Sequence, residues 1–271
     1  MRDNPRLIWC SITGFGKNCP YAPRATYDFV IQAISVLLSL NVIEGIGPRR
    51  VPIPVSDLFT GLYGTIATLT AVNRRHQTGE GTIIDVSLLD TQVCANRLHI
   101  MGDLLGKQQT GRYAPADLLP QVVVEAADGS VALVIASDAQ YQRLVDAMGC
   151  IALSSNPKLV DNRARLANLP ELAAELRRMF QGIPTSEVVT RLADQGVPVA
   201  RVNSIRNFAT DLHLQDRELI VHIPSPAGCT NSLLAVRLPI LFDGQAALPD
   251  TSAPLLVQHT AEVLVDPRWG G

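Results

Sequence analysis

The pattern of apolar and polar positions predicts the first elements of the chain. A continuous apolar run at residues 7–12 predicts a buried strand, which ends in a glycine turn. Residues 26–38 predict an almost completely buried helix, in which Tyr27, Asp28 and Gln32 are the polar exceptions. Because unpaired polar groups are costly to bury, these three side chains are expected to face a cleft or to pair inside the protein.

A second helix is predicted after an extended approach that two prolines stiffen. Apolar residues recur at helical spacing over residues 58–72, which predicts Ser56 as the N-cap and Asp57 as a first-turn residue. Basic residues and Gly79 mark the end of this helix. The helix also carries a stripe of small residues, which would let another backbone pack closely: Gly61, Gly64, Thr68 and Ala71.

The pattern after Gly79 predicts an α/β layer followed by a smaller α+β domain. A strand at 82–87 and a helix at 88–102 complete the layer. Apolar runs on both sides of Asp128-Gly129 then predict a β-hairpin. The later expected helices are 138–148, 170–180, 185–195, 204–212 and a short one that ends the segment 253–264, and residues 217–223 and 232–238 are expected to form another antiparallel pair.

Composition narrows the class of protein. The 271 residues are 47% hydrophobic and 18% charged, yet no apolar run reaches the roughly 18 residues that a membrane span needs. The first residues lack the layout of a signal peptide, so a cytoplasmic location without membrane contact is expected. Five scattered cysteines predict a reducing compartment, with neither disulfides nor a structural metal. The net charge of -2 argues against nucleic acid as the main partner.

Asp57 is the best candidate for chemistry, because the usual phosphate-binding, dinucleotide, serine-hydrolase and zinc motifs are absent from the sequence. The positive end of a helix helps keep a first-turn carboxylate ionised and fixed in direction, as a carboxylate nucleophile requires. An ordinary helix start has the same pattern, so both interpretations remain open at this point. For the other candidates a structural role is favoured: the turn 14–16, Asp85, Asp90 and His259.

Six segments resemble, in this order, class III CoA-transferases: 11–16, 27–33, 55–61, 74–81, 85–90 and 254–260. This family includes formyl-CoA, carnitine-CoA and bile-acid-CoA transferases, and α-methylacyl-CoA racemase is a close relative. The resemblance implies an α/β fold that forms an interlocked homodimer. It also implies three parts: the remainder of a large Rossmann-like domain at 1–113, a small α+β domain at 114–212, and a segment at 213–271 that returns to the large domain.

The resemblance implies a CoA transfer that uses no prosthetic group. The carboxylate that matches Asp57 attacks an acyl-CoA thioester, and an aspartyl anhydride and then an aspartyl-CoA thioester form before a small carboxylic acid takes over the CoA. Coenzyme A and acyl-CoA are therefore substrates. The residues that match the CoA-lining segment of formyl-CoA transferase are Arg24, Ala25, Thr26, Tyr27 and Asp28. The lysine of that enzyme is Ala25 here, so its contact is either missing or supplied by Arg24.

Several alternatives follow from departures from the family pattern. Racemases carry a histidine just before the Asp28 position, and Tyr27 in its place favours the transferase. The Rossmann-like half that precedes the first strand in family members is not in the sequence. The chain is therefore expected to be a truncated, inactive fragment, a chain whose N-terminal half is a separate polypeptide, or a working variant. Val257 stands where the family usually has glycine.

Overall fold

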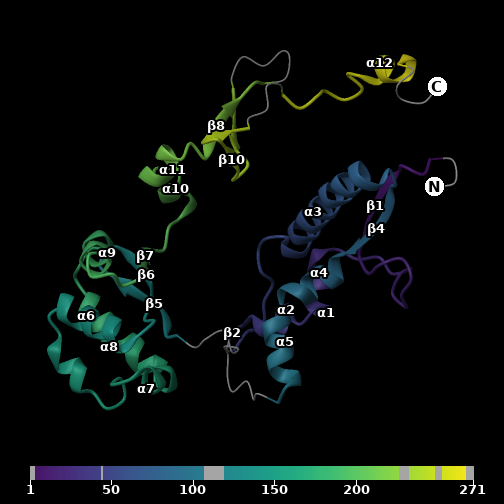
Figure 1. Ribbon diagram of the computed structural model, residues 1–271. Coiled ribbons are helices and arrows are strands. Elements are labelled where there is room, and N and C mark those ends of the chain that lie inside the picture. Colours follow the sequence, from purple (N-terminus) through teal and green to yellow (C-terminus); the bar gives the residue numbers. More distant parts are fainter. Residues whose placement is uncertain (1–3, 44, 107–118, 226–231, 248–251, 267–271) are drawn as a thin grey trace. The chain divides into compact units, whose positions relative to one another are not determined.

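The computed structural model describes residues 4–43, 45–106, 119–225, 232–247 and 252–266. Within them the chain has a mixed α/β fold, with small sheets of two or three strands beside helices (Figure 1). None of the described helices is both long and apolar enough to cross a membrane. The chain divides into two compact units. The first comprises Met1–Val124, Leu133–Met179 and Thr190–Val199, and the second comprises Glu125–Ala132, Phe180–Val189 and Ala200–Gly271.

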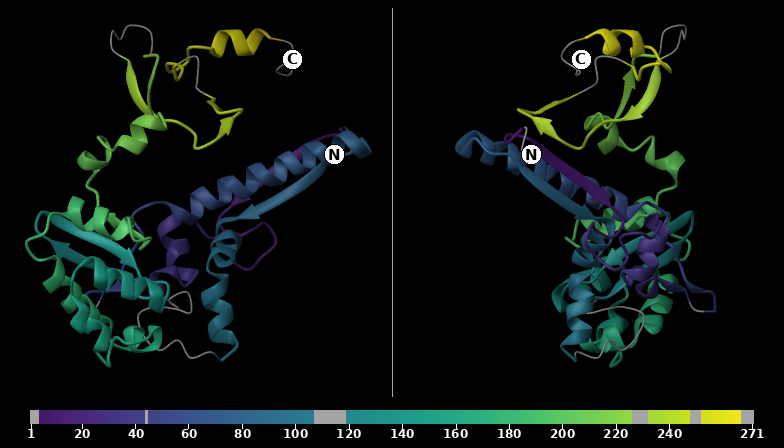
Figure 2. Two further views of the ribbon diagram at one scale, coloured as in Figure 1. Left: turned by 60° about the vertical axis from the view of Figure 1, so that its left-hand side comes forward. Right: turned by 90° about the vertical axis from the view of Figure 1, so that its right-hand side faces the viewer.

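A two-stranded parallel sheet packs along one long helix in the first unit. Strand β1 (Ile8–Thr13) pairs with β4 (Thr82–Ser87), and both strands lie along α3 (Val55–Thr78) in the two views of Figure 2. The two strands were predicted, but the expectation of a buried first strand is wrong, since Trp9 is 54% exposed. Among the described residues this sheet has only two strands, so much of β1 is left uncovered.

Helix α3 packs through its small residues and not through its large apolar ones. Its buried residues are Ser56, Thr60, Gly64 and Ala71. A Cβ atom added to Gly64 would lie 3.1 Å from Cδ1 of Ile12, so β1 approaches the helix closely at this point. By contrast, the apolar residues that predicted the helix are largely exposed: Leu58, Leu62, Ile66 and Leu69. The predicted close approach along the small stripe therefore occurs at Gly64, while Gly61 is exposed.

The two predicted helices on either side of α3 in the sequence are both broken. The segment 26–38 forms α1 (Asp28–Ile34) and α2 (Leu37–Leu40), and the segment 88–102 forms α4 (Leu88–Ala95) and α5 (Arg97–Leu104). The breaks touch one another, because the Asn96 side-chain amide donates a 2.7 Å hydrogen bond to the Ser35 carbonyl. The expectation of a nearly fully buried helix at 26–38 is also wrong, since only Asp28, Ile31 and Gln32 are buried in α1.

The middle of the chain follows the predicted pattern more closely. The hairpin at Asp128-Gly129 is confirmed and forms, with one further strand, a sheet of order β5-β6-β7. The strands are β5 (Gln121–Ala126), β6 (Gly129–Val134) and β7 (Val199–Arg201). The three predicted helices appear as α6 (Asp138–Ala147), α8 (Leu169–Phe180) and α9 (Thr185–Ala193), whereas η1 (Ile151–Ser155), α7 (Asn162–Ala167) and β7 were not predicted.

The buried arginine of α7 shows why that helix was difficult to predict. Arg165 is completely buried, and its guanidinium pairs with Asp138 and donates a 2.9 Å hydrogen bond to the Leu159 carbonyl. The guanidinium carbon also lies 4.6 Å from the centre of the Tyr141 ring. A charged residue in a short polar segment predicts a surface loop, and only these partners from other elements make its burial possible.

The last part of the chain contains short elements. The predicted helix at 204–212 is two helices, α10 (Ile205–Phe208) and α11 (Leu212–Asp216). The predicted antiparallel pair is confirmed as β8 (Ile220–Ile223) and β9 (Leu233–Val236), and the terminal helix as α12 (Thr260–Val265). The remaining strand pairs are β2 (Val42–Ile43) with β3 (Gly47–Pro48) and β10 (Leu241–Phe242) with β11 (Gln245–Ala246). Residues 107–118, between the predicted α/β layer and the hairpin, and residues 226–231, between β8 and β9, lie outside the described residues.

Candidate active site

Asp57 lies in the first turn of α3, as predicted, and its side chain is exposed. The helix begins two residues earlier than the sequence predicted, at Val55 instead of Asp57. Its N-cap residue is Pro54, which has no polar side-chain atom that could cap the helix. The expectation that Ser56 is the N-cap is therefore wrong, because Ser56 is already inside the first turn and is completely buried.

A carboxylate from another helix caps the start of α3. The Oδ1 atom of Asp28 accepts hydrogen bonds from the backbone N–H of Ser56 at 3.0 Å and from the Ser56 hydroxyl at 2.6 Å. Asp28 is 5% exposed and is also the first residue of α1. Its negative charge thus lies at the positive ends of two helices, which favours a buried carboxylate there. The half-exposed guanidinium of Arg50 lies 3.8 Å from Oδ2.

Gln32, one turn further along α1, completes the arrangement. Its side-chain amide donates a 2.7 Å hydrogen bond to Oδ2 of Asp28, and its Oε1 atom accepts one of 3.0 Å from the backbone N–H of Val51. The same amide nitrogen lies 3.4 Å from the carbonyl of Ile53. Asp28 and Gln32 therefore pair inside the protein, which was one of the two alternatives for the polar residues of this helix.

Two threonines join α3 to α4 next to this arrangement. The Thr60 hydroxyl lies 2.6 Å from the Ser56 carbonyl, and the hydroxyl oxygens of Thr60 and Thr91 share a hydrogen bond of 2.7 Å. Both threonines are buried. Sequence reasoning missed Ser56, Thr60 and Thr91 as site-forming residues. The available signal was the spacing of Ser56 and Thr60, which places two hydroxyl groups on one face of an apolar helix.

The pKa of Asp57 is raised, first by partial removal of its carboxyl from water and second by the negative charge of Asp28. The sequence predicted that the helix start would keep this carboxylate ionised. Partial burial of the carboxyl, followed by the negative charge of Asp28, moves the pKa of Asp57 upward in spite of the helix end. Ionisation of Asp57 therefore requires a higher pH than ionisation of an ordinary aspartate.

Of the five residues expected at the CoA site, only Asp28 has a hydrogen bond with Ser56, the residue that precedes Asp57. Tyr27 precedes α1 and is 82% exposed, and Arg24 places its guanidinium carbon 3.8 Å from the centre of the Tyr21 ring. Ala25 is exposed and Thr26 is partly buried. These side chains leave an accessible segment immediately before the buried Asp28.

The glycine turn after β1 lies against the segment before α1. The Gly14 carbonyl accepts a hydrogen bond from the backbone N–H of Leu89 at 3.1 Å, and a side chain at Gly14 would collide with Thr26. Asp85 accepts a hydrogen bond of 3.2 Å from the backbone N–H of Lys17. This contact supports the structural interpretation of Asp85.

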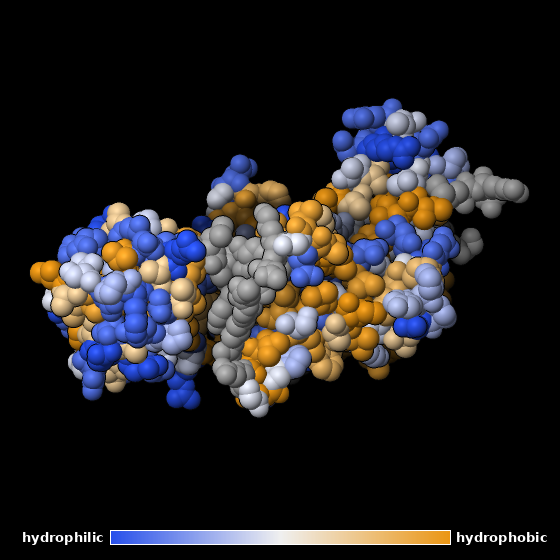
Figure 3. Space-filling model, turned by 90° about the horizontal axis from the view of Figure 1, so that it is seen from below, coloured by the Kyte–Doolittle hydropathy of each residue, from blue (hydrophilic) through white to orange (hydrophobic). Residues whose placement is uncertain are grey.

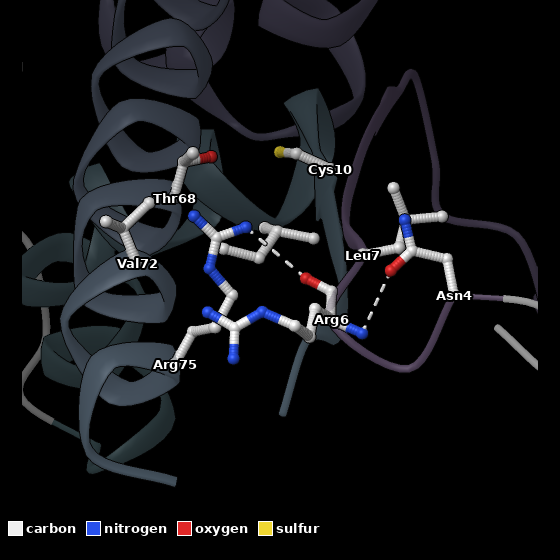
Figure 4. A pocket seen from close by; sticks show the side chains of 8 residues that line it. Asn4, Arg6, Leu7, Cys10, Thr68, Val72 and Arg75 are labelled. Carbon is white, nitrogen blue, oxygen red and sulfur yellow. Dashed lines mark hydrogen bonds between the residues drawn. The ribbon is translucent and has the colours of Figure 1, made fainter. Parts of the chain in front are cut away.

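A concave feature lies at the other end of α3 (Figure 4). It is a cavity of about 480 Å³, lined by Asn4, Arg6, Leu7, Ile8, Cys10, Thr68, Val72 and Arg75. The Arg75 guanidinium donates to the Arg6 carbonyl at 3.3 Å, and the Arg6 guanidinium donates to the Gly79 carbonyl at 3.4 Å. Since a helix of 24 residues is about 36 Å long, this cavity is not part of the surroundings of Asp57.

The first unit also leaves a large apolar surface uncovered. Hydrophobic side chains, orange in Figure 3, reach the surface over much of the face shown there. The exposed fractions on α3 are 56% for Leu58, 60% for Leu62, 59% for Ile66 and 64% for Leu69. Contiguous apolar surface of this kind marks a contact with other polypeptide more often than a free surface.

Comparison with known proteins relates this chain to one family. The model of CoA-transferase family III matches residues 1–260. The chain is 31% identical over 265 residues to the succinate–glutarate CoA-transferase of Agrobacterium fabrum, an alignment that covers 97% of this chain and 66% of the relative. It is 29% identical over 264 residues to the succinyl-CoA:glutarate CoA-transferase of Homo sapiens, covering 96% and 59%.

A solved structure agrees with the sequence comparisons. The crystal structure of a CAIB/BAIF family protein from Brucella suis superimposes with a TM-score of 0.81 at 30% sequence identity, over 96% of this chain and 68% of that one. The chain spans about three fifths to two thirds of the length of the curated relatives that it matches.

Proposed function

The chain belongs to CoA-transferase family III, and from that premise we propose that it moves CoA from an acyl-CoA donor to a carboxylic acid, with Asp57 as the nucleophile. The observation that carries this proposal is the placement of Asp57. Its carboxylate is exposed in the first turn of α3, while the residues on which that turn rests are buried and hydrogen-bonded. A nucleophile needs this combination of access and fixed direction.

The proposed reaction proceeds through two kinds of intermediate on Asp57. A carboxylate oxygen of Asp57 attacks the thioester carbonyl, the C–S bond breaks, and the CoA thiolate leaves a mixed anhydride on the enzyme. The thiolate then attacks the aspartyl carbonyl of the anhydride and expels the donor carboxylate, which gives an aspartyl-CoA thioester. The acceptor carboxylate repeats these steps in reverse order and regenerates the Asp57 carboxylate. No oxidant, metal or net proton is consumed in this cycle.

The names of the relatives favour a class of substrate. Two of them are named for succinate or succinyl-CoA together with glutarate. We propose succinyl-CoA as a donor and a short dicarboxylic acid as the acceptor for this chain. The accessible segment of Arg24, Ala25, Thr26 and Tyr27 is the proposed place of contact with CoA, and Arg24 provides its positive charge.

The proposed assembly is a homodimer of the interlocked family type. The proposed domain boundaries are those predicted above, with a partial Rossmann-like large domain that contains α3. The exposed apolar residues of α3 and the uncovered face of β1 support a contact with further polypeptide, either a second copy or a separate N-terminal half. The cytoplasmic location stays a prediction.

The experiment that tests the proposal traps the activated carboxyl of Asp57, because hydroxylamine attacks the aspartyl carbonyl of the anhydride or of the thioester and displaces succinate or CoA. The protein is incubated with succinyl-CoA and hydroxylamine, and its peptides are examined by mass spectrometry. A hydroxamate is expected at Asp57. It should be absent in Asp57→Asn and retained in Asp85→Asn, in which the changed side chain accepts a hydrogen bond from the backbone N–H of Lys17. No adduct with any of a broad panel of acyl-CoA donors, together with no CoA binding, would refute the proposal.

The same apolar surface favours a second candidate, a subunit that is inactive alone. In that case the isolated chain binds no CoA, and binding appears when a polypeptide that carries the remaining third of a family member is added. Calorimetric titration with CoA, with and without such a partner, separates the two candidates. CoA binding by the chain alone excludes the inactive subunit.

A further inference from the structure

The start of α3 depends on a residue that lies far from it in the sequence. A helix start leaves backbone N–H groups without partners, and the N-cap side chain usually accepts one of them. Here Pro54 occupies that position, and the carboxylate of Asp28 accepts the N–H of Ser56 instead. The hydroxyl of Ser56 gives the same oxygen a second hydrogen bond.

The other oxygen of Asp28 is also used inside the protein. It accepts the amide of Gln32, and Gln32 in turn holds the extended approach to α3 at the N–H of Val51 and the carbonyl of Ile53. The approach and the first turn are thus fixed to one face of α1. Because Asp57 directly follows Ser56 in the same helical turn, these hydrogen bonds restrain its backbone.

We infer that Asp28 is a positioning residue, which caps α3 through Ser56 and thereby fixes the direction of the Asp57 carboxylate. This inference rests on the proposed function, because it assigns Asp28 a task in the reaction of Asp57. In this role Asp28 needs no contact with CoA. Its 5% exposure and the hydrogen bonds to both of its oxygens fit a residue that acts through its neighbours.

Four variants test this assignment. Asp28→Ala removes the cap and the charge, while Asp28→Asn keeps an oxygen that can accept from Ser56. Ser56→Ala removes one of the two hydrogen bonds to Oδ1 and keeps the backbone N–H. Asp103→Asn, on the exposed side of α5 in the same unit, is the matched control.

The first readout is the rate at which hydroxylamine traps the activated carboxyl of Asp57 as a hydroxamate. We expect Asp28→Ala to lower this rate by about tenfold to a hundredfold, since small displacements of a reacting group have effects of that size. Asp28→Asn and Ser56→Ala should fall between Asp28→Ala and the unchanged protein, and Asp103→Asn should keep the full rate. CoA affinity, measured by calorimetry, should change by less than about threefold, because the lost interaction affects only the reacting group.

The second readout is independent of activity. Hydrogen exchange of the Ser56 amide should be about tenfold faster or more in Asp28→Ala, because its acceptor is lost, and unchanged in Asp103→Asn. The inference would be overturned if Asp28→Ala had the same trapping rate and the same amide exchange rate as the unchanged protein. If the unchanged protein forms no adduct, the proposed function fails and the exchange rate alone decides the capping role. If Asp28→Ala does not fold, Asp28→Asn and Ser56→Ala decide both readouts.

Discussion

Asp28 and Asp57 bring two carboxylates to one helix start, where the first is buried and hydrogen-bonded to Ser56 and the second is exposed. The two have different tasks in the proposed reaction. Asp28 holds the first turn of α3, and its charge contributes to the raised pKa of Asp57. A similar separation of roles by environment is common where two carboxylates lie close together.

The raised pKa of Asp57 predicts a pH dependence of acyl transfer. Only the ionised carboxylate is a nucleophile, so the trapping rate should rise with pH through a midpoint above 3.8, the ordinary value for aspartate. Asp28→Asn removes the neighbouring charge and should move this midpoint to lower pH. The pH profile of trapping and a ¹³C NMR titration of the Asp57 carboxyl both measure the midpoint. An unchanged or higher midpoint in Asp28→Asn would contradict the coupling of the two carboxylates.

The same shift has a consequence for stability, with a defined sign. A raised pKa means that the folded state binds a proton more tightly at Asp57 than the unfolded state does. The contribution of Asp57 to stability is therefore present at low pH and decreases as pH rises through the folded pKa. Urea unfolding of Asp57→Asn as a function of pH should lack this decrease, and a decrease identical to that of the unchanged protein would assign it to other groups.

Gly64 is predicted to be the most size-sensitive position of α3. Gly64→Val should destabilise the protein by about 1–3 kcal/mol, because its side chain would enter the space of Ile12. Gly61→Val is the matched control, since a Cβ at Gly61 meets no described atom within 4 Å, and it should change stability by less than about 0.5 kcal/mol. The midpoint of urea unfolding measures both values. Equal effects at the two positions would show that β1 does not pack against α3 in this way.

The hydrogen bond between Thr60 and Thr91 should contribute to the packing of α3 on α4. Thr60→Val keeps the shape of the side chain but leaves the buried hydroxyl of Thr91 with one partner fewer. This change should lower the stability of the protein by about 1–2 kcal/mol. Combining it with Thr91→Val should cost less than the sum of the single changes, because neither hydroxyl then remains. Thr65→Val removes an exposed hydroxyl from the same helix and should have little effect. Strict additivity of the two buried changes would contradict this contact.

Val36, in the connection between α1 and α2, should lower the stability of the protein because of its backbone conformation. Its φ angle of 77° lies in the left-handed region, which costs a residue with a Cβ atom about 1–2 kcal/mol. Val36→Gly relieves this cost and should be more stable than Val36→Ala, which keeps the Cβ atom. Glycine loses more chain entropy on folding than alanine does, and this cost offsets part of the relieved strain. We therefore expect Val36→Gly to be more stable than Val36→Ala in urea unfolding by no more than about 1 kcal/mol. A more stable alanine variant would show that the connection is not strained.

Local patterns determined several of the regular elements of this protein. The strands β1 and β4, the stop of α3 at Gly79 and the hairpin at Asp128-Gly129 follow from apolar runs and turn residues, whereas the parallel pairing of β1 with β4 was not predicted. These signals depend on neighbours along the chain, so one sequence is enough to detect them. The order of the matching segments likewise predicted the family.

The tertiary structure decided which surfaces are buried and what the polar groups contact. Periodicity shows that one side of α3 is apolar, but the close approach of β1 at Gly64 buried the side with the small residues. The cap of α3 comes from Asp28, and the break at Ser35 meets the break at Asn96, through hydrogen bonds between residues distant in the sequence. The tertiary packing determines these partners, because a buried polar group must form a hydrogen bond with whichever residue the fold brings next to it.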